Sequence, residues 1–245
     1  MRKTLGEKGF GDDPGFRWRG GDVSRIEGLS DAVFAFAMTL LIVSLEVPKS
    51  FDGLINTLLQ FPAFGIAFIF LFSIWYHHYV FFRRYGLNNM SIVVVNGLLM
   101  FLVLFFVFPF RWAVSFVINF LFFNLFLGLD VPLGIEIDGF TMERYSIIHS
   151  FYAGGILAIH LCFAWFYYKA YRLHKELALD EQEIKLTYLG IIEFFIVVGI
   201  CVLSILLVWI VPAPFNGQAS GWIFVLIWPL TYFAGKKVRA DKVTN

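Results

Sequence analysis

Charge is scarce in this chain of 245 residues. Charged residues make up 15% of it, whereas a typical soluble domain carries about 25%. The formal net charge is only +1, which argues against a nucleic-acid-binding protein, because such a protein needs a basic face. The 1–24 segment is polar and glycine-rich and has no apolar core, so we expect no cleavable signal peptide.

Cysteine is nearly absent as well, with Cys162 and Cys201 as the two examples. Both fall inside apolar runs, where a free cysteine behaves as a small hydrophobic residue. We therefore expect two packing residues and no disulfide.

Several functional motifs are missing from the sequence. It has no T-V-G-Y-G-like segment of the kind that forms potassium-channel filters, no G-x-x-x-x-G-K-[ST] phosphate loop and no Ser/His/Asp arrangement at membrane depth. It also lacks the two matching halves with broken helices that are typical of secondary transporters. These absences argue against each of those classes.

Hydrophobic residues dominate instead, at 59% of the chain, with 31 phenylalanines and a mean hydropathy of +0.76. An apolar run of about 20 residues is long enough to cross a bilayer as a helix. We therefore predict an all-α polytopic membrane protein with six transmembrane helices. The expected spans are Ser30–Val47, Phe61–Phe82, Ile92–Val114, Ile147–Tyr168, Ile191–Val211 and Trp222–Phe233. The apolar 112–129 segment is interpreted as an extension of the third helix or an interfacial segment, and residues 49–60 as a small interfacial helix.

The positive charges indicate the orientation. With six spans, sixteen of the nineteen lysines and arginines fall on the side that holds both termini. Positive residues stay cytoplasmic, so both termini are expected inside, and a seventh span would break this pattern. The chain then divides into a polar cytoplasmic lead (1–24), a six-helix transmembrane domain (25–235) and a basic cytoplasmic tail (236–245).

The first predicted helix carries one apolar stripe. At about 100° per residue, Phe36 and six further side chains of this helix lie within about 40° of the direction of Phe36. All of those that follow the first, Arg25, are apolar. The seven residues are Arg25, Leu29, Ala32, Phe36, Leu40, Val43 and Val47. Such a stripe is typical of ordinary helix packing, or of a narrow hydrophobic pore lining formed when several copies meet around an axis. Spacing alone leaves both interpretations open.

Polar residues at membrane depth need partners. Asp31 and Ser30 begin the first helix, His77 and His78 lie at a similar depth on the second, and Asn96 lies on the third. We expect a hydrogen-bonded set that fixes how the first helix packs.

Metal or haem binding is a competing interpretation of the two histidines. Adjacent residues on a helix point about 100° apart, so they chelate one ion poorly. The remaining histidines are scattered, and we predict no metal site. Glu46, near the outer end of the first helix, marks the water interface or an outer mouth that concentrates cations.

The stretch from Arg25 through Gly28, Leu29, Ser30 and Asp31 resembles the R-x-x-x-F-S-D signature of the transmembrane protein 175 family. Two further stretches fit the same family: Trp75-Tyr76-His77-His78, and Asn96-Gly97-Leu98-Leu99 through Phe108-Pro109-Phe110. The match covers about residues 24–112, and beyond them only the span count and topology agree.

The resemblance implies a potassium-permeable cation channel of the prokaryotic type, in which single six-helix repeats assemble as a homotetramer and the first helix lines the pore. Carried over to this sequence, the pore constriction becomes Phe36, Leu40 and Val43, with Thr39 as a nearby polar contributor. The supporting polar network becomes Arg25, Ser30, Asp31, His77 and Asn96. Two residues depart from the family pattern: Leu29 replaces the signature phenylalanine, and Phe36 stands where leucine or isoleucine is usual.

The sequence thus predicts a multi-pass protein of the cell membrane, not an enzyme, that conducts K⁺ without a cofactor. Its expected partners are copies of itself, the lipid bilayer and monovalent cations, with no nucleic acid. The alternatives are a proton or weakly selective cation leak channel, an intramembrane enzyme that uses His77 or His78, and a non-conducting membrane scaffold.

Overall fold

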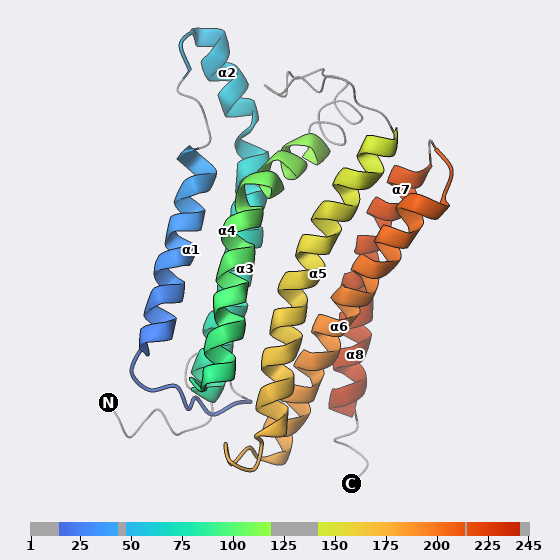
Figure 1. Ribbon diagram of the computed structural model, residues 1–245. Coiled ribbons are helices and arrows are strands. Elements are labelled where there is room, and N and C mark those ends of the chain that lie inside the picture. The colour runs from blue at the N-terminus through green and yellow to red at the C-terminus, as the bar shows by residue number, and fades with distance from the viewer. Residues whose placement is uncertain (1–14, 44–47, 119–141, 214, 241–245) are drawn as a thin grey trace.

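The computed structural model describes residues 15–43, 48–118, 142–213 and 215–240. These residues form helices and no β-strand, which confirms the all-α prediction. The helices are α1 (Arg25–Val43), α2 (Phe51–Leu59), α3 (Phe61–Tyr85), α4 (Met90–Ile118), α5 (Met142–Arg172), α6 (Glu181–Ile210), α7 (Asn216–Trp222), the 3₁₀ helix η2 (Ile223–Leu226) and α8 (Ile227–Ala240). Figure 1 shows the long helices standing side by side, with the short α2 projecting beyond one end.

Five helices of the described part are long and apolar enough to cross a membrane. They are α1, α3, residues 90–107 of α4, residues 144–172 of α5, and α6. Each corresponds to one of the first five predicted spans.

The sixth predicted span, Trp222–Phe233, is not one continuous helix. It is divided among the end of α7, η2 and the first half of α8. Pro229 lies in the first turn of α8, where its missing N–H costs no helical hydrogen bond. All three pieces pack against α6, and in Figure 1 the end of α8 and the start of the described chain lie at the same end of the bundle. The count of six crossings therefore stays a prediction.

The helix ends follow local sequence signals. Pro62 occupies the first turn of α3, and Gly86 ends that helix at a φ of 59° while its N–H bonds to the carbonyl of Phe82. A left-handed residue at this position favours glycine.

At the other end of the bundle, α4 continues to Ile118, as the extension interpretation of the 112–129 segment predicts. Residues 119–129 lie outside the described residues. Pro109 stands inside α4, which bends along its last turns in Figure 1, because an interior proline removes a hydrogen bond and clashes with the preceding turn.

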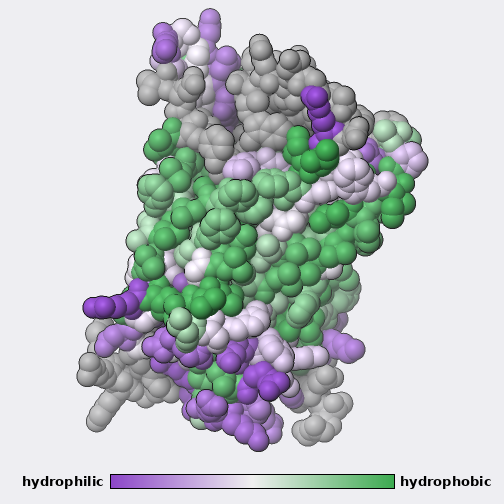
Figure 2. Space-filling view, in the orientation of Figure 1, coloured by the Kyte–Doolittle hydropathy of each residue, from purple (hydrophilic) through white to green (hydrophobic). Residues whose placement is uncertain are grey.

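The core combines aliphatic side chains with a group of aromatic rings where α3, α5 and α6 meet. Phe81 stacks on Phe166 with ring centroids 4.9 Å apart, and Phe163 stacks on Phe194 at 5.2 Å. Both cysteines are buried and free, as predicted. Figure 2 shows hydrophobic side chains in a broad band across the middle of the face in view and hydrophilic side chains gathered toward its ends. An apolar belt of this extent is what a lipid-facing surface requires.

The first helix and its polar support

One face of α1 packs against α3 and α4. Its buried residues are Glu27, Ser30, Phe34, Ala37 and Leu41. They recur every three or four positions, which is the spacing of one helical face. This face holds α1 in the bundle, and it is distinct from the stripe that contains Phe36.

The Phe36 stripe points away from the rest of the chain. Phe36 is 57% exposed and Val43 is 73% exposed within one chain. Thr39 is exposed too, and its hydroxyl donates a hydrogen bond of 2.7 Å to the carbonyl of Phe36. Leu40 stands at the edge of the stripe, half-buried, and packs against the core. Three of the four predicted pore residues are thus available for contact outside the protomer.

A chain of buried hydrogen bonds ties α1 to α3 and α4. The Nδ2 group of Asn96 donates to the hydroxyl of Ser30 at 2.8 Å, and that hydroxyl donates to the carbonyl of Ile26 at 2.8 Å. On the other side of the amide, Nε2 of His78 lies 2.9 Å from Oδ1 of Asn96. Because the amide oxygen can only accept, the histidine is the donor. Ser30, His78 and Asn96 are all buried. Their hydrogen bonds satisfy the polar groups that the three side chains turn toward one another, as buried polar groups require.

The histidine in this hydrogen-bonded chain is His78, whereas the expected set contained His77. The two side chains point about 100° apart on one helix, so only one can face Asn96. His77 lies on the side of α3 that faces α5 and α6, with its ring 6.0 Å from that of Phe163 and 5.4 Å from that of Phe194.

Asp31 takes a different partner from the one expected. Its carboxylate accepts a hydrogen bond of 2.9 Å from the indole N–H of Trp75 on α3. Arg25, at the start of α1, is exposed. The structure therefore brings Ser30 and Asn96 together, and places Asp31, His77 and Arg25 apart from them. The position predicted for the outer mouth, Glu46, lies outside the described residues.

The start of α1 has a support that the expected residues did not include. The hydroxyl and N–H of Ser24 both donate to Glu27, at 2.7 Å and 3.0 Å, and the N–H of Glu27 lies 3.3 Å from the Ser24 hydroxyl. This reciprocal arrangement is a capping box. Arg83 at the end of α3 pairs with Glu27 at 3.7 Å. The S-x-x-E spacing of Ser24 and Glu27 was visible in the sequence.

A second ionic group lies just before α1. The segment of residues 15–24, here called the N-terminal strap, places Arg17 and Arg19 beside Glu183 at the start of α6. The carboxylate of Glu183 is fully buried and receives hydrogen bonds from both arginines. No sequence signal could reveal this contact, because about 164 positions separate its members.

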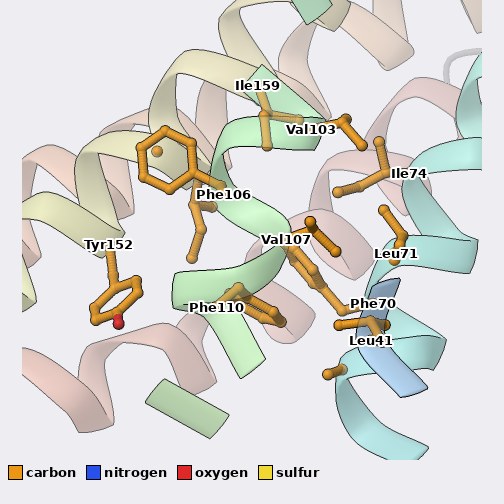
Figure 3. A pocket seen from close by; sticks show the side chains of 13 residues that line it. Leu41, Phe70, Leu71, Ile74, Val103, Phe106, Val107, Phe110, Tyr152 and Ile159 are labelled. Carbon is orange, nitrogen blue, oxygen red and sulfur yellow. The ribbon is translucent and has the colours of Figure 1, made fainter. Parts of the chain in front are cut away.

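A small apolar cavity of about 30 Å³ lies behind α1. Figure 3 shows its lining, to which α1 contributes Leu41, α3 contributes Leu71 and Ile74, and α4 contributes Val103 and Val107. Within the described ranges, no three or more histidine, cysteine, aspartate or glutamate side chains cluster closely enough to hold a metal ion.

Comparisons with known proteins agree on one family. The model of the endosomal/lysosomal potassium channel TMEM175 family matches residues 25–108, which begin at the first residue of α1. A potassium channel from Marivirga tractuosa is 31% identical over 238 residues, covering 96% of this chain and 95% of that protein. A potassium channel from Chamaesiphon minutus is 34% identical over 96 residues, covering 36% of this chain and 47% of that protein.

Solved structures give the same result. The crystal structure of the potassium channel MtTMEM175 with a nanobody–MBP fusion protein superposes with a TM-score of 0.80 at 29% identity, and covers 94% of this chain and 100% of that one. A TMEM175 homologue from Chamaesiphon minutus, described as a lysosomal potassium-selective channel, superposes with a TM-score of 0.54 at 24% identity, covering 86% of this chain and 96% of that one. The second likeness supports the fold alone.

These relatives are ion channels, which sets aside the intramembrane-enzyme interpretation of His77 and His78. The conserved architecture extends over nearly the whole chain, including the α5–α8 half that the motifs did not cover. The chain belongs to the TMEM175 family of potassium channels.

Proposed function

We propose that this chain assembles as a homotetramer in the cell membrane and conducts K⁺ through a pore lined by α1. The observation that carries the proposal is the exposed apolar face of α1, on which Phe36 and Val43 are 57% and 73% exposed among the described residues. The ion is suggested by the relatives, which are named potassium channels. The proposal involves no cofactor and no chemical turnover; the partners are the other subunits, the bilayer and the permeating cations.

The proposed constriction is a stack of apolar rings. Phe36, Leu40 and Val43 follow one another by four and three residues, which correspond to about 6 Å and about 4.5 Å along a helix axis. Four copies would place three successive rings around the axis. Rings of this kind can control permeation by excluding water, and the chain has no T-V-G-Y-G segment to supply a carbonyl filter. Thr39 is the neighbouring polar residue, and its oxygen keeps free acceptor capacity after donating to Phe36.

The polar support explains how α1 could hold its pore face toward an axis. The Ser30–Asn96–His78 hydrogen bonds fix the rotation of α1 against α3 and α4. A turn of about 100° would bring a neighbouring stripe to the axis, and it would also break these buried hydrogen bonds. Their loss therefore opposes rotation.

The test is cation flux through liposomes that contain the purified protein. We expect potassium flux, and a reversal potential under opposed potassium and sodium gradients that favours K⁺. Leu40→Ala should change the flux by about threefold or more, because it widens a hydrophobic ring. The matched control is Leu206→Ala, a half-exposed leucine on α6, which should conduct like the wild type.

Three results would overturn the proposal. They are flux no higher than in protein-free liposomes, a monomer in detergent and in lipid nanodiscs, or equal effects of the two leucine variants. A reversal potential with no preference for K⁺ would instead support the weakly selective leak channel, which is favoured by the phenylalanine at position 36 of the proposed constriction.

A further inference from the structure

The N-terminal strap (residues 15–24) lies across the end of the bundle and contributes no residue to the proposed constriction. It is anchored by Phe16, which is fully buried. The ring of Phe16 meets Tyr85 edge-on at 5.3 Å, and the guanidinium of Arg84 lies 4.9 Å from its centroid. Both partners belong to the last turn of α3. The strap is therefore packed against the bundle and does not hang free.

Glu183 is the centre of the ionic contacts of the strap. Its side chain is fully buried, at 0% exposure. Nη2 of Arg19 donates to it at 2.6 Å, and the backbone N–H of Arg17 donates at 2.8 Å. The N–H of Asp180 adds a third short bond, of 3.0 Å, from the capping box that begins α6. A buried carboxylate requires such compensation, so Glu183 depends on the strap as much as the strap depends on it.

Arg19 also binds the corner between α5 and α6. Its Nε donates to the carbonyl of Leu177 at 2.7 Å, and Nη2 donates to the carbonyl of Ala178 at 3.2 Å. Ala178 adopts a φ of 46°, so the corner is a sharply defined turn. One guanidinium thus joins this turn to the N-terminal strap.

The other edge of the strap is bonded to α3. The N–H groups of Arg19 and Gly20 both donate to the carbonyl of Arg83, at 3.0 Å each. Arg83 in turn donates from Nη1 to the carbonyl of Gly21 at 2.9 Å, and it pairs with Glu27 in the first turn of α1. The strap therefore links three places: the start of α1, the end of α3 and the α5–α6 corner.

We propose that Glu183 is a positioning residue for the pore helix. It holds the strap through Arg19, and the strap restrains the adjoining end of α1, so that a movement of the α5–α6 corner is transmitted to the pore. This inference rests on the proposed function, in which α1 lines the pore. It assigns to the α5–α6 half of the protein a part in conduction that does not require contact with the ion.

The first test neutralises the carboxylate. Glu183→Gln keeps the shape of the side chain and removes its charge, and Glu181→Gln is the control, because Glu181 is exposed on the same helical turn. In detergent, we expect tryptic cleavage after Arg17 and Arg19 to become about tenfold faster in Glu183→Gln only, since cleavage follows the population in which the strap is released. In liposomes with equal amounts of tetramer, we expect potassium flux to rise about threefold, because α1 can then move away from the axis.

The second test leaves every charge in place. A Cβ added to Gly20 would lie 2.5 Å from the carbonyl oxygen of Phe82, whereas one added to Gly21 would meet nothing within 4 Å. Gly20→Ala should therefore release the strap and raise the flux as Glu183→Gln does, and Gly21→Ala should do neither. If Glu183→Gln does not assemble, Gly20→Ala decides the question.

The outcomes separate this inference from the proposal of a pore. A wild-type protein without potassium flux would overturn the pore. If the wild type conducts, two results would overturn the positioning role alone. One is tryptic cleavage of the strap that is no faster in Glu183→Gln than in the wild type. The other is a potassium flux that is unchanged or reduced in a variant whose strap is released. A rise in both cleavage and flux in Glu183→Gln and Gly20→Ala, with neither control affected, supports it.

Discussion

Asn96 on α4 donates a hydrogen bond of 2.8 Å to Ser30 on α1, and both residues are buried. The contact joins two helices at a point where neither could find water. The Ser30 hydroxyl also donates to the carbonyl of Ile26 in α1. This second bond fixes the orientation of the hydroxyl that Asn96 contacts.

His78 and His77 should differ in their effect on stability. Replacing His78 by phenylalanine removes the donor to Asn96 and leaves a buried amide oxygen unsatisfied, which costs about 1–3 kcal/mol. His77→Phe removes a ring that meets only aromatic neighbours among the contacts described, and should change the free energy of unfolding by less than about 0.5 kcal/mol. Denaturant unfolding of the purified protein in detergent measures both. Equal losses would contradict the assignment of His78 to the buried set.

Two adjacent glycines of α5 should respond in opposite ways to alanine. A Cβ at Gly155 would lie 2.4 Å from the ring of Phe106 on α4, whereas one at Gly154 would meet nothing within 4 Å. Gly155→Ala should therefore destabilise the protein by about 1–3 kcal/mol through overpacking. Gly154→Ala should stabilise it by about 0.5–1 kcal/mol, because alanine loses less backbone entropy in a helix. Thermal unfolding in detergent is the measurement, and a destabilised Gly154→Ala would show that α5 packs differently.

Phe36 should limit conductance if it belongs to the constriction. Phe36→Leu replaces the ring by a smaller apolar side chain and should raise potassium flux by about threefold, because a wider apolar ring is more easily wetted. Phe195→Leu on α6 is the matched control, since Phe195 is 52% exposed against 57% for Phe36. Flux in liposomes at equal protein content distinguishes them, and a lower flux in Phe36→Leu would argue that this ring supports the pore instead of narrowing it.

Trp75 and Asp31 should be energetically coupled. Trp75→Phe removes the indole N–H that donates to Asp31 at 2.9 Å, and should lower the free energy of unfolding by about 0.5–1.5 kcal/mol. A double-mutant cycle with Asp31→Ala isolates the pair, because the effect of Trp75→Phe should nearly vanish once the carboxylate is absent. Trp228→Phe, at a tryptophan that is 76% exposed, is the control and should show no such dependence. Additive effects of Trp75→Phe and Asp31→Ala would refute the coupling.

Local patterns in the sequence were enough to predict the helices of the first five spans. Apolar runs of sufficient length are helical in a bilayer whatever their neighbours are, because every backbone group must be satisfied within the segment. The sixth predicted span shows where this reasoning weakens, since Pro229 and the η2 turn divide an apolar stretch that hydropathy treats as continuous. The buried state of Cys162 and Cys201 follows from the same local reasoning.

The partners of the polar groups were only partly predictable. Ser30 and Asn96 were expected in one hydrogen-bonded set because polar groups at membrane depth need partners, and they do bond to each other. Depth could not distinguish His77 from His78, because they differ by rotation around the helix and hardly by height. Nor did depth identify Trp75 as the donor to Asp31, since the indole N–H belongs to a large aromatic side chain that a pattern of polar residues does not single out.

The sequence by itself determined that this chain is helical, apolar enough for a membrane and related to the TMEM175 channels, because hydropathy, helical period and the motif after Arg25 are properties of neighbouring residues. Only the tertiary structure decided which face of α1 is left uncovered, which histidine meets Asn96, and that Glu183 receives Arg17 and Arg19. The reason is geometric. Each of these outcomes depends on how helices rotate and pack against one another, and residues on different helices leave no periodic trace of the contact they make.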